Sequence, residues 1–185
     1  MRIEIISGSP REGSITKRVA LFLHKHLQEC TQHQIGLIDV REWNLPPLQD
    51  IFNSVEQTPE VFRPLSERMF GANAFILVTP EYNGSYTPAL KNVLDYYPKH
   101  SHKAFGIVTA SNGMSGGLRA TQQMQLLVNA LFGIACPQML VVGQVEKKFD
   151  PSGQLIDPTF QRQIDLFTKE FIWLAERLYP EANKS

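Results

Sequence analysis

The sequence predicts an α/β fold built on a doubly wound, five-stranded parallel sheet with helices on both faces. Three observations predict it. Short β-branched runs alternate with longer amphipathic stretches, which is the pattern of βαβ units. The run at residues 75–78 is apolar on both sides, as a strand covered on both faces requires. The length of 185 residues suits one domain, and we expect residues 1–185 to form it.

The alternating pattern places five strands and five helices along the chain. The strands are expected at residues 2–7, 34–40, 74–79, 103–110 and 138–142. The helices are expected between and after them, at residues 16–29, 59–70, 88–97, 116–132 and 158–179. Ligands of such a sheet bind beyond the carboxyl ends of its strands, so the loops that follow the first, third and fourth strands are the informative ones.

Local signals mark several helix ends. Pro64 lies inside the helix at 59–70, which predicts either a kink or a later start. Gly133 is placed to end the helix at 116–132. Asp157 followed by Pro158 marks the start of the last helix. That helix has apolar residues alternately four and three apart, which predicts one buried face: Phe160, Ile164, Phe167, Phe171, Leu174 and Leu178.

Composition and charge exclude several classes of protein. The 18 Lys and Arg residues balance the 18 Asp and Glu residues, so neither a nucleic-acid-binding protein nor a strongly acidic carrier is indicated. The two cysteines, Cys30 and Cys136, form no CxxC pair and are too few for a disulfide framework. No apolar stretch approaches the ~20 residues of a membrane span, and the first residues lack a signal-peptide pattern. We expect a cytoplasmic protein with no nucleic-acid or membrane partner.

The histidines do not predict a metal site. His24 and His26 lie two residues apart on a predicted helix and point to different faces, so they cannot chelate as an i, i+4 pair would. His100 and His102 flank a loop and are expected to be solvated. We therefore expect no bound metal.

The loop after the first strand has the composition of an anion site. Residues 7–16 supply several hydroxyls, Gly8, Gly13 and the cation of Arg11 directly before a helix. Such a helix start offers free backbone N–H groups to a phosphate. It is not a Walker loop, because Ser14 stands where the lysine belongs, and the chain has no GxGxxG. Taken alone, a serine-rich turn with a capped helix explains the loop equally well.

Two further loops can approach a flat ligand. After the third strand, Asn83 and Gly84 predict a tight turn whose N–H groups can bind the acceptor edge of a heterocycle, with Tyr82 packed on it. A simple turn before the cap of the next helix is the alternative. After the fourth strand, three glycines within residues 113–117 allow close backbone approach. Together the three loops indicate one site for a phosphorylated, flat-ring cofactor of one nucleotide's size.

These segments resemble the NAD(P)H-dependent FMN reductase family within the flavodoxin-like proteins, which includes quinone, azo-dye and chromate reductases. The resemblance is carried by three segments: residues 8–11 with Ser14, residues 80–85 with Pro88, 90–92 and Asp95, and residues 111–120. It runs over nearly the whole chain, including residues 45–48 and the closing helix. It implies a flavodoxin-like fold with FMN as cofactor.

The resemblance also implies which residues bind FMN. The phosphate would lie on Ser9, Arg11, Ser14 and Thr16. The isoalloxazine and ribityl chain would lie on Pro80, Glu81, Tyr82, Asn83 and Gly84. The other side of the ring would be lined by Ser111, Asn112, Gly113 and Gly116. Family members often have asparagine at the position of Thr16 and tryptophan at that of Tyr96.

The activity implied is ping-pong hydride transfer from NADPH or NADH to bound FMN, then to a small acceptor such as a quinone, flavin, azo compound or metal oxyanion. No catalytic acid or base is assigned, because the flavin carries the chemistry. The alternative is a flavodoxin-type electron carrier that does not itself oxidise NAD(P)H; such carriers are typically acidic and have a threonine-rich phosphate loop.

The resemblance further implies a homodimer, with some members pairing into a homotetramer. The sequence offers one reason of its own. The helix expected at 88–97 has more apolar and aromatic residues than one sheet-facing stripe needs, which indicates a partner face: Leu90, Val93, Leu94, Tyr96 and Tyr97.

Overall fold

A twisted parallel sheet forms the centre of the computed structural model, which describes residues 1–179. Its long strands are β1 (Arg2–Ser7), β2 (Gln34–Asp39), β3 (Ala74–Thr79) and β4 (Ala104–Ala110). They lie in the order β2-β1-β3-β4, and two short strands, β5 (Ile134–Ala135) and β6 (Leu140–Val142), pair with β4. All of these pairs are parallel. The predicted doubly wound α/β fold is confirmed.

The fifth strand is the main departure from prediction, because it forms in two pieces. β5 pairs with the start of β4, at Ala104 and Phe105, and β6 pairs with its end. Pro137 lies between the pieces and has no N–H to donate to a sheet ladder. The prediction of one strand at 138–142 therefore located β6 and missed β5.

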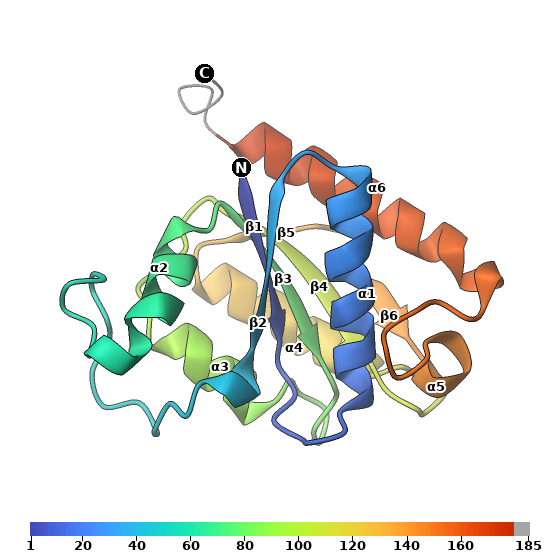
Figure 1. Cartoon of the computed structure of the whole chain (residues 1–185), viewed down its shortest axis with the longest axis horizontal. Helices are drawn as coiled ribbons and strands as arrows, with labels where there is room; N and C mark the ends of the chain where they lie inside the picture. Colours follow the sequence, from blue (N-terminus) through green and yellow to red (C-terminus); the bar gives the residue numbers. More distant parts are fainter. Residues whose placement is uncertain (180–185) are drawn as a thin grey trace.

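Helices cover both faces of the sheet (Figure 1). α1 (Ile15–Cys30) and α6 (Gln161–Leu178) share one core with the sheet. α2 (Arg63–Gly71), α3 (Pro88–Asp95) and α4 (Leu118–Ala130) share the other. The short helix α5 (Val145–Lys148) follows β6. Single turns of 3-10 helix occur at Val40–Glu42, Glu60–Phe62 and Pro158–Phe160.

The structure settles one helix end for which the sequence allowed two outcomes, and it corrects another. Pro64 lies in the first turn of α2, where its missing N–H costs nothing, so it moved the start of the helix instead of kinking it. At the end of α4 the left-handed residue is Phe132, with φ 56°, and not Gly133. Gly133 is needed for space instead, because a Cβ there would lie 2.4 Å from the Phe105 ring.

The proposed partner face on α3 is wrong. All five apolar and aromatic side chains from Leu90 to Tyr97 are buried within the chain. Phe52, from the long segment after β2, packs on two of them: its ring centroid lies 4.7 Å from that of Tyr96 and 5.8 Å from that of Tyr97. The sequence could not show that this segment folds back over α3.

His100 is also not solvated, as had been expected. It is 4% exposed, and its ring lies 4.8 Å from Phe75 and 6.2 Å from Phe105. Burial, together with the nearby Lys103 charge, lowers its pKa to about 3. Its Nε2 has no hydrogen-bond partner among the described residues. His100 is therefore a neutral core residue.

Within residues 1–179, no helix is both long enough and apolar enough to cross a membrane.

Candidate functional site

The loops after β1, β3 and β4 meet at one edge of the sheet. β1 and β3 are neighbours, and the chain leaves β1 outward to β2 before it returns to β3, so a crevice opens between their carboxyl ends. Figure 1 shows the loops after β1 and β3 side by side below the sheet. A cavity of about 370 Å³ lies there, lined by Ser9, Arg11, Gly13, Ser14, Ile15, Thr16, Pro80, Glu81, Tyr82, Ala110, Ser111 and Asn112.

Nine of the thirteen predicted site residues line this cavity. The exceptions are Asn83, Gly84, Gly113 and Gly116, which lie on the same loops but outside the lining. Three lining residues were not predicted: Gly13, Ile15 and Ala110. Gly13 and Ile15 belong to the loop at residues 7–16 that was predicted to bind an anion, and Ala110 is the last residue of β4. Their positions in the sequence could therefore have identified them.

The first loop presents hydrogen-bond donors that the protein does not use. The backbone N–H groups of Ser9, Arg11, Glu12 and Gly13 donate to no protein group within residues 1–179. Ser14 occupies the N-cap position of α1, yet its side chain makes no capping hydrogen bond. Free N–H groups and a hydroxyl at a helix start form an anion site.

Gly8 allows this loop to lie close to α3. A Cβ at Gly8 would lie 2.9 Å from the Cβ of Leu90. The Gly8 N–H donates to the Val78 carbonyl at 2.8 Å, and the Thr87 hydroxyl donates to the Gly8 carbonyl. Gly8 is therefore fixed between the ends of β3 and α3, and it places Ser9 at the cavity.

Thr16 differs from the other phosphate candidates. Its side chain is buried, and its hydroxyl donates to the Ala110 carbonyl at 3.3 Å, which ties α1 to the end of β4. The Thr16 hydroxyl proton is therefore not available to a ligand. The donor that Thr16 can offer a ligand is its N–H, which lies in the first turn of α1, where backbone donors have no partner within the helix.

An ion-pair cluster that sequence reasoning missed supports the first loop. Asp39, at the end of β2, is buried and binds Arg41 at 2.6 Å and Lys17 at 2.8 Å. Burial alone would raise the pKa of Asp39, but hydrogen bonds from Arg41 and Lys17 hold it below its ordinary value. Arg41 also donates to the Arg11 carbonyl at 3.4 Å. A polar residue at the end of β2, next to β1, was the signal available in the sequence.

The second loop contains the tight turn that the sequence predicted. Tyr82 N–H donates to the Ser85 carbonyl at 2.8 Å, and Ser85 N–H donates back at 3.1 Å. The two residues between them, Asn83 and Gly84, have φ values of 51° and 85°. Positive φ at both positions is the signature of a type I′ turn, which favours asparagine followed by glycine.

Glu81 joins the second loop to α4. The N-cap of α4 is Gly117, which has no side chain to cap the helix. Glu81 does so instead: its Oε2 accepts from the Arg119 N–H at 3.2 Å, and its Oε1 accepts from the Arg119 guanidinium at 3.4 Å. One wall of the cavity is thereby attached to the start of α4.

The glycines of the third loop serve packing. A Cβ at Gly116 would lie 2.7 Å from the Gly143 nitrogen, and a Cβ at Gly143 would lie 2.5 Å from the Met114 carbonyl oxygen. The loop after β4 thus lies directly against the segment between β6 and α5. Gly116 was predicted as a ring-lining residue, whereas its observed contact is with this segment.

A family model described as NADPH-dependent FMN reductase matches residues 1–147 of this sequence. The chain belongs to that family. As a member it is an NAD(P)H-dependent oxidoreductase with FMN as cofactor, which confirms the enzyme class and the cofactor expected from the sequence.

The sequence similarity of this FMN reductase family member to known proteins extends over nearly its whole length. It is 30% identical over 179 residues to an FMN-dependent NADPH-azoreductase from Staphylococcus aureus, which covers 91% of this chain and 92% of the azoreductase. It is 28% identical over 180 residues to an NADH:(hydroxy)cinnamate reductase subunit, CrdA, from Vibrio ruber, covering 94% and 86% of the two chains.

Solved structures place this family member among flavodoxin-like folds. The flavoenzyme NAD(P)H:(acceptor) oxidoreductase FerB from Paracoccus denitrificans superposes with a TM-score of 0.74 at 19% identity, covering 95% of this chain and 97% of FerB. A flavodoxin variant from Pseudomonas aeruginosa superposes with a TM-score of 0.52 at 20% identity, covering 96% and 97%. At these identities the likeness is one of fold.

The residues of the cavity fit FMN. A flavin mononucleotide needs an anion site at one end and a flat slot at the other. The unused N–H groups of the first loop, the Ser14 hydroxyl and the Arg11 guanidinium supply donors for a phosphate. Tyr82 of the second loop and Ser111 of the third loop belong to the same lining. No group of three acidic, histidine or cysteine side chains that could hold a metal occurs within residues 1–179.

Proposed function

We propose that this oxidoreductase works by a ping-pong mechanism in which NAD(P)H and a small electron acceptor use one cavity in turn. The observation that carries the proposal is that the three loops enclose a single cavity at the carboxyl edge of the sheet. Bound FMN would accept a hydride from the nicotinamide and deliver reducing equivalents to the acceptor. Because both substrates must reach the same flavin, the first product leaves before the acceptor binds.

In this proposal the chain binds and orients, and no side chain acts as acid or base. Arg11, Ser9 and Ser14 hold the phosphate, with the N–H groups of the first turn of α1. The second loop, Pro80 through Gly84, flanks the ring and ribityl chain. Ser111 and Asn112 form the opposite wall, while Gly113 and Gly116 set the path of that wall. The unused donors of the first loop support the phosphate assignment.

Anaerobic mixing of the FMN-loaded protein with NADPH or NADH tests the first half-reaction. We expect either nucleotide alone to bleach the flavin absorbance, with no partner reductase. Bleaching only after addition of a separate reductase would identify a flavodoxin-type electron carrier instead. Comparison of the bleaching rates with NADPH and with NADH under the same conditions shows which nucleotide the enzyme prefers.

The reduced protein is then mixed with acceptors. The panel includes a quinone, free flavin and chromate, which are the acceptor classes expected from the sequence. It also includes an azo dye, because the Staphylococcus aureus relative is named an azoreductase. A hydroxycinnamate is added because of the Vibrio ruber relative. We expect rapid reoxidation by at least one of them, and parallel double-reciprocal plots in steady state. Intersecting plots would overturn the ping-pong order.

We also propose that the protein is a homodimer, with a tetramer of two dimers as an extension. The exposed face of α4 supports this. Leu118 and Leu126 are 55% and 63% exposed, and nearby Phe132 is 62% exposed. Arg119 is the one charged residue between Leu118 and Ala130. A face with exposed leucines and a single charged residue can pack against its own copy with little like-charge repulsion.

Light scattering at micromolar concentration tests the assembly. We expect the mass of a dimer or tetramer, and a monomer for Leu126→Glu, which places charges in the contact. Leu166→Glu, on the exposed side of α6, is the matched control. A monomeric wild type would overturn the proposal.

We propose further that residues 1–185 form one FMN-binding domain. We also propose that the enzyme acts in the cytoplasm, where pyridine nucleotides are held. Fractionation of cells tests the location.

A further inference from the structure

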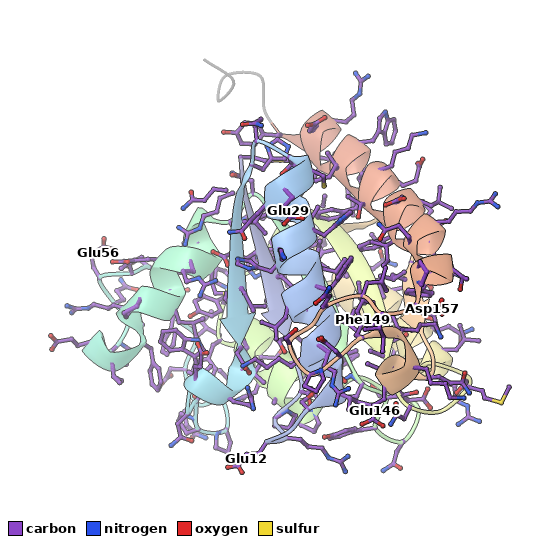
Figure 2. The ribbon with its side chains drawn as sticks, turned by 45° about the vertical axis from the view of Figure 1, so that its right-hand side comes forward. Glu12, Glu29, Glu56, Glu146, Phe149 and Asp157 are labelled. Carbon is purple, nitrogen blue, oxygen red and sulfur yellow. The ribbon has the colours of Figure 1, made fainter. Side chains whose placement is uncertain are left out.

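Glu146 connects the phosphate-binding helix to the opposite wall of the cavity. It lies on α5, outside the cavity lining and outside the residues that sequence reasoning singled out. Figure 2 shows Glu146 beside the lower end of α1, with Phe149 above it between α1 and α5. Its contacts reach Asn112 of the third loop and Arg18 of α1.

The Asn112 amide is held at both ends by this one residue. Its Oδ1 accepts from the Glu146 backbone N–H at 3.2 Å, and its Nδ2 donates to the Glu146 carboxylate. Both polar ends of the side chain are thus directed at α5. Asn112 lines the cavity, but its amide is already engaged and is not free for a flavin.

The backbone on either side of Asn112 hydrogen-bonds to residues 142–145, directly before Glu146. Ser111 N–H donates to the Val142 carbonyl at 3.0 Å, and the Ser111 carbonyl accepts from the Val145 N–H at 3.3 Å. The Gly113 carbonyl accepts from the Gln144 N–H at 3.3 Å. The third loop is therefore anchored along residues 142–146, and the Glu146 side chain adds a contact to Asn112.

Arg18 extends the connection to α1. Its guanidinium lies 3.4 Å from the Glu146 carboxylate and donates to the Phe149 carbonyl at 3.2 Å. The Arg18 side chain is 18% exposed and that of Glu146 is 52% exposed, so the ion pair alone is weak. Its effect is geometric, because α1 begins at the loop that presents the phosphate donors.

We propose that Glu146 is a positioning residue for the flavin site: by holding both ends of the Asn112 amide and pairing with Arg18, it fixes the third loop relative to the phosphate-binding end of α1. The inference rests on the proposed FMN site. A cofactor held at both ends gains affinity when the two ends are fixed at the right separation before it binds.

Four variants test the role. Glu146→Ala removes the carboxylate contact with Asn112, whereas Glu146→Gln keeps an oxygen that accepts from Asn112 Nδ2. Asn112→Ala removes both amide contacts. Lys147→Ala, the exposed neighbour on α5, is the matched control. We expect Glu146→Ala and Asn112→Ala each to weaken FMN binding by about tenfold, with Glu146→Gln and Lys147→Ala within about twofold of wild type.

Coupling separates positioning from general stability. The double variant of Glu146→Ala and Asn112→Ala is expected to bind FMN no more weakly than Asn112→Ala alone, since without the Asn112 amide the Glu146 side chain no longer holds the third loop. The melting temperatures of the apo variants are expected to match wild type. Fully additive losses, or loss of affinity in Glu146→Gln equal to that in Glu146→Ala, would overturn the proposal.

Hydrogen exchange of the apo protein tests the loop without any cofactor. Amides of residues 111–117 are expected to exchange several-fold faster in Glu146→Ala and in Asn112→Ala than in wild type or Lys147→Ala. Unchanged exchange in Glu146→Ala would overturn the positioning role. If wild type itself fails to bind FMN, the proposed site fails, and the exchange result still decides whether Glu146 fixes the loop.

Discussion

The guanidinium of Arg11 lies over the aromatic ring of Tyr82, 5.6 Å from the ring centroid. The two residues come from different loops, so this cation–π contact spans the cavity between the first and second loops. The contact holds the Arg11 guanidinium, the one cation of the first loop, at the cavity and leaves its N–H groups available to a ligand. Nearby Glu12, by contrast, projects outward from the tip of the loop (Figure 2).

Arg11→Ala is expected to lower FMN affinity by about ten- to a hundredfold, because a charge-assisted hydrogen bond to phosphate contributes about 1.5–3 kcal/mol. Arg119→Ala is the control, since Arg119 is 83% exposed on α4 and pairs with Glu81. Flavin content of the purified proteins and titration by fluorescence quenching measure the effect. Equal occupancy in the two variants would contradict the phosphate assignment.

Arg41→Ala is expected to weaken FMN binding by about tenfold, because it leaves the Asp39 carboxylate with Lys17 as its remaining ion-pair partner beside the phosphate loop. Asp39→Asn removes the negative charge and is expected to bind FMN at least as tightly as wild type. A purely structural role for the cluster predicts the opposite for Asp39→Asn, namely weaker binding. Arg177→Ala, on the exposed end of α6, is the control.

Gly36→Ala is expected to destabilise the protein by about 1–3 kcal/mol, as overpacking of a core does. A Cβ at Gly36 would lie 2.2 Å from Glu4 Oε2. Glu4 cannot move freely, because its buried carboxylate binds Arg68 and also binds Arg2 at 2.9 Å. Urea unfolding measures the change. Gly71→Ala, whose Cβ would meet the flexible end of Arg2 at 3.3 Å, should stay near wild type.

His100 makes stability depend on pH in the acidic range. Its pKa is about 3 in the folded protein against 6.5 for the free side chain. Between these values the unfolded chain binds a proton that the folded chain does not, so stability falls as pH is lowered, by about 1.4 kcal/mol per pH unit for this group. His100→Leu should flatten the curve between pH 4 and 6.5, as measured by chemical denaturation. His102→Asn, at an exposed position two residues away, is the matched control for replacing a histidine in this loop.

The arrangement of the three loops could be predicted from sequence because it follows from topology. In a parallel sheet every loop after a strand emerges at the same edge, so finding polar, glycine-bearing segments after the first, third and fourth strands was enough. The tight turn at Asn83 and Gly84 was equally predictable, because those residue types in that order favour one turn. Nine predicted residues therefore line one cavity.

The contacts that support the site could not be predicted in the same way. Asp39 binds Lys17, 22 positions earlier, and Glu146 binds Asn112, 34 positions earlier; neither pair has a local pattern. His100 was misjudged because its burial depends on Phe75 and Phe105, which belong to other elements. The packing of Phe52 on Tyr96 and Tyr97 likewise depends on the path of a long segment that has no periodicity to read.

The glycines at the edge of the site restrict where this enzyme can change. Gly8, Gly116 and Gly143 each stand where one added carbon would fall within 3 Å of a neighbouring Cβ, nitrogen or carbonyl oxygen. Mutations at these positions would deform the loops, whereas the side chain of Met114, two residues before Gly116, is 89% exposed and can be replaced freely. A library of folded variants of the third loop would therefore keep the three glycines and randomise Met114 and Ser115.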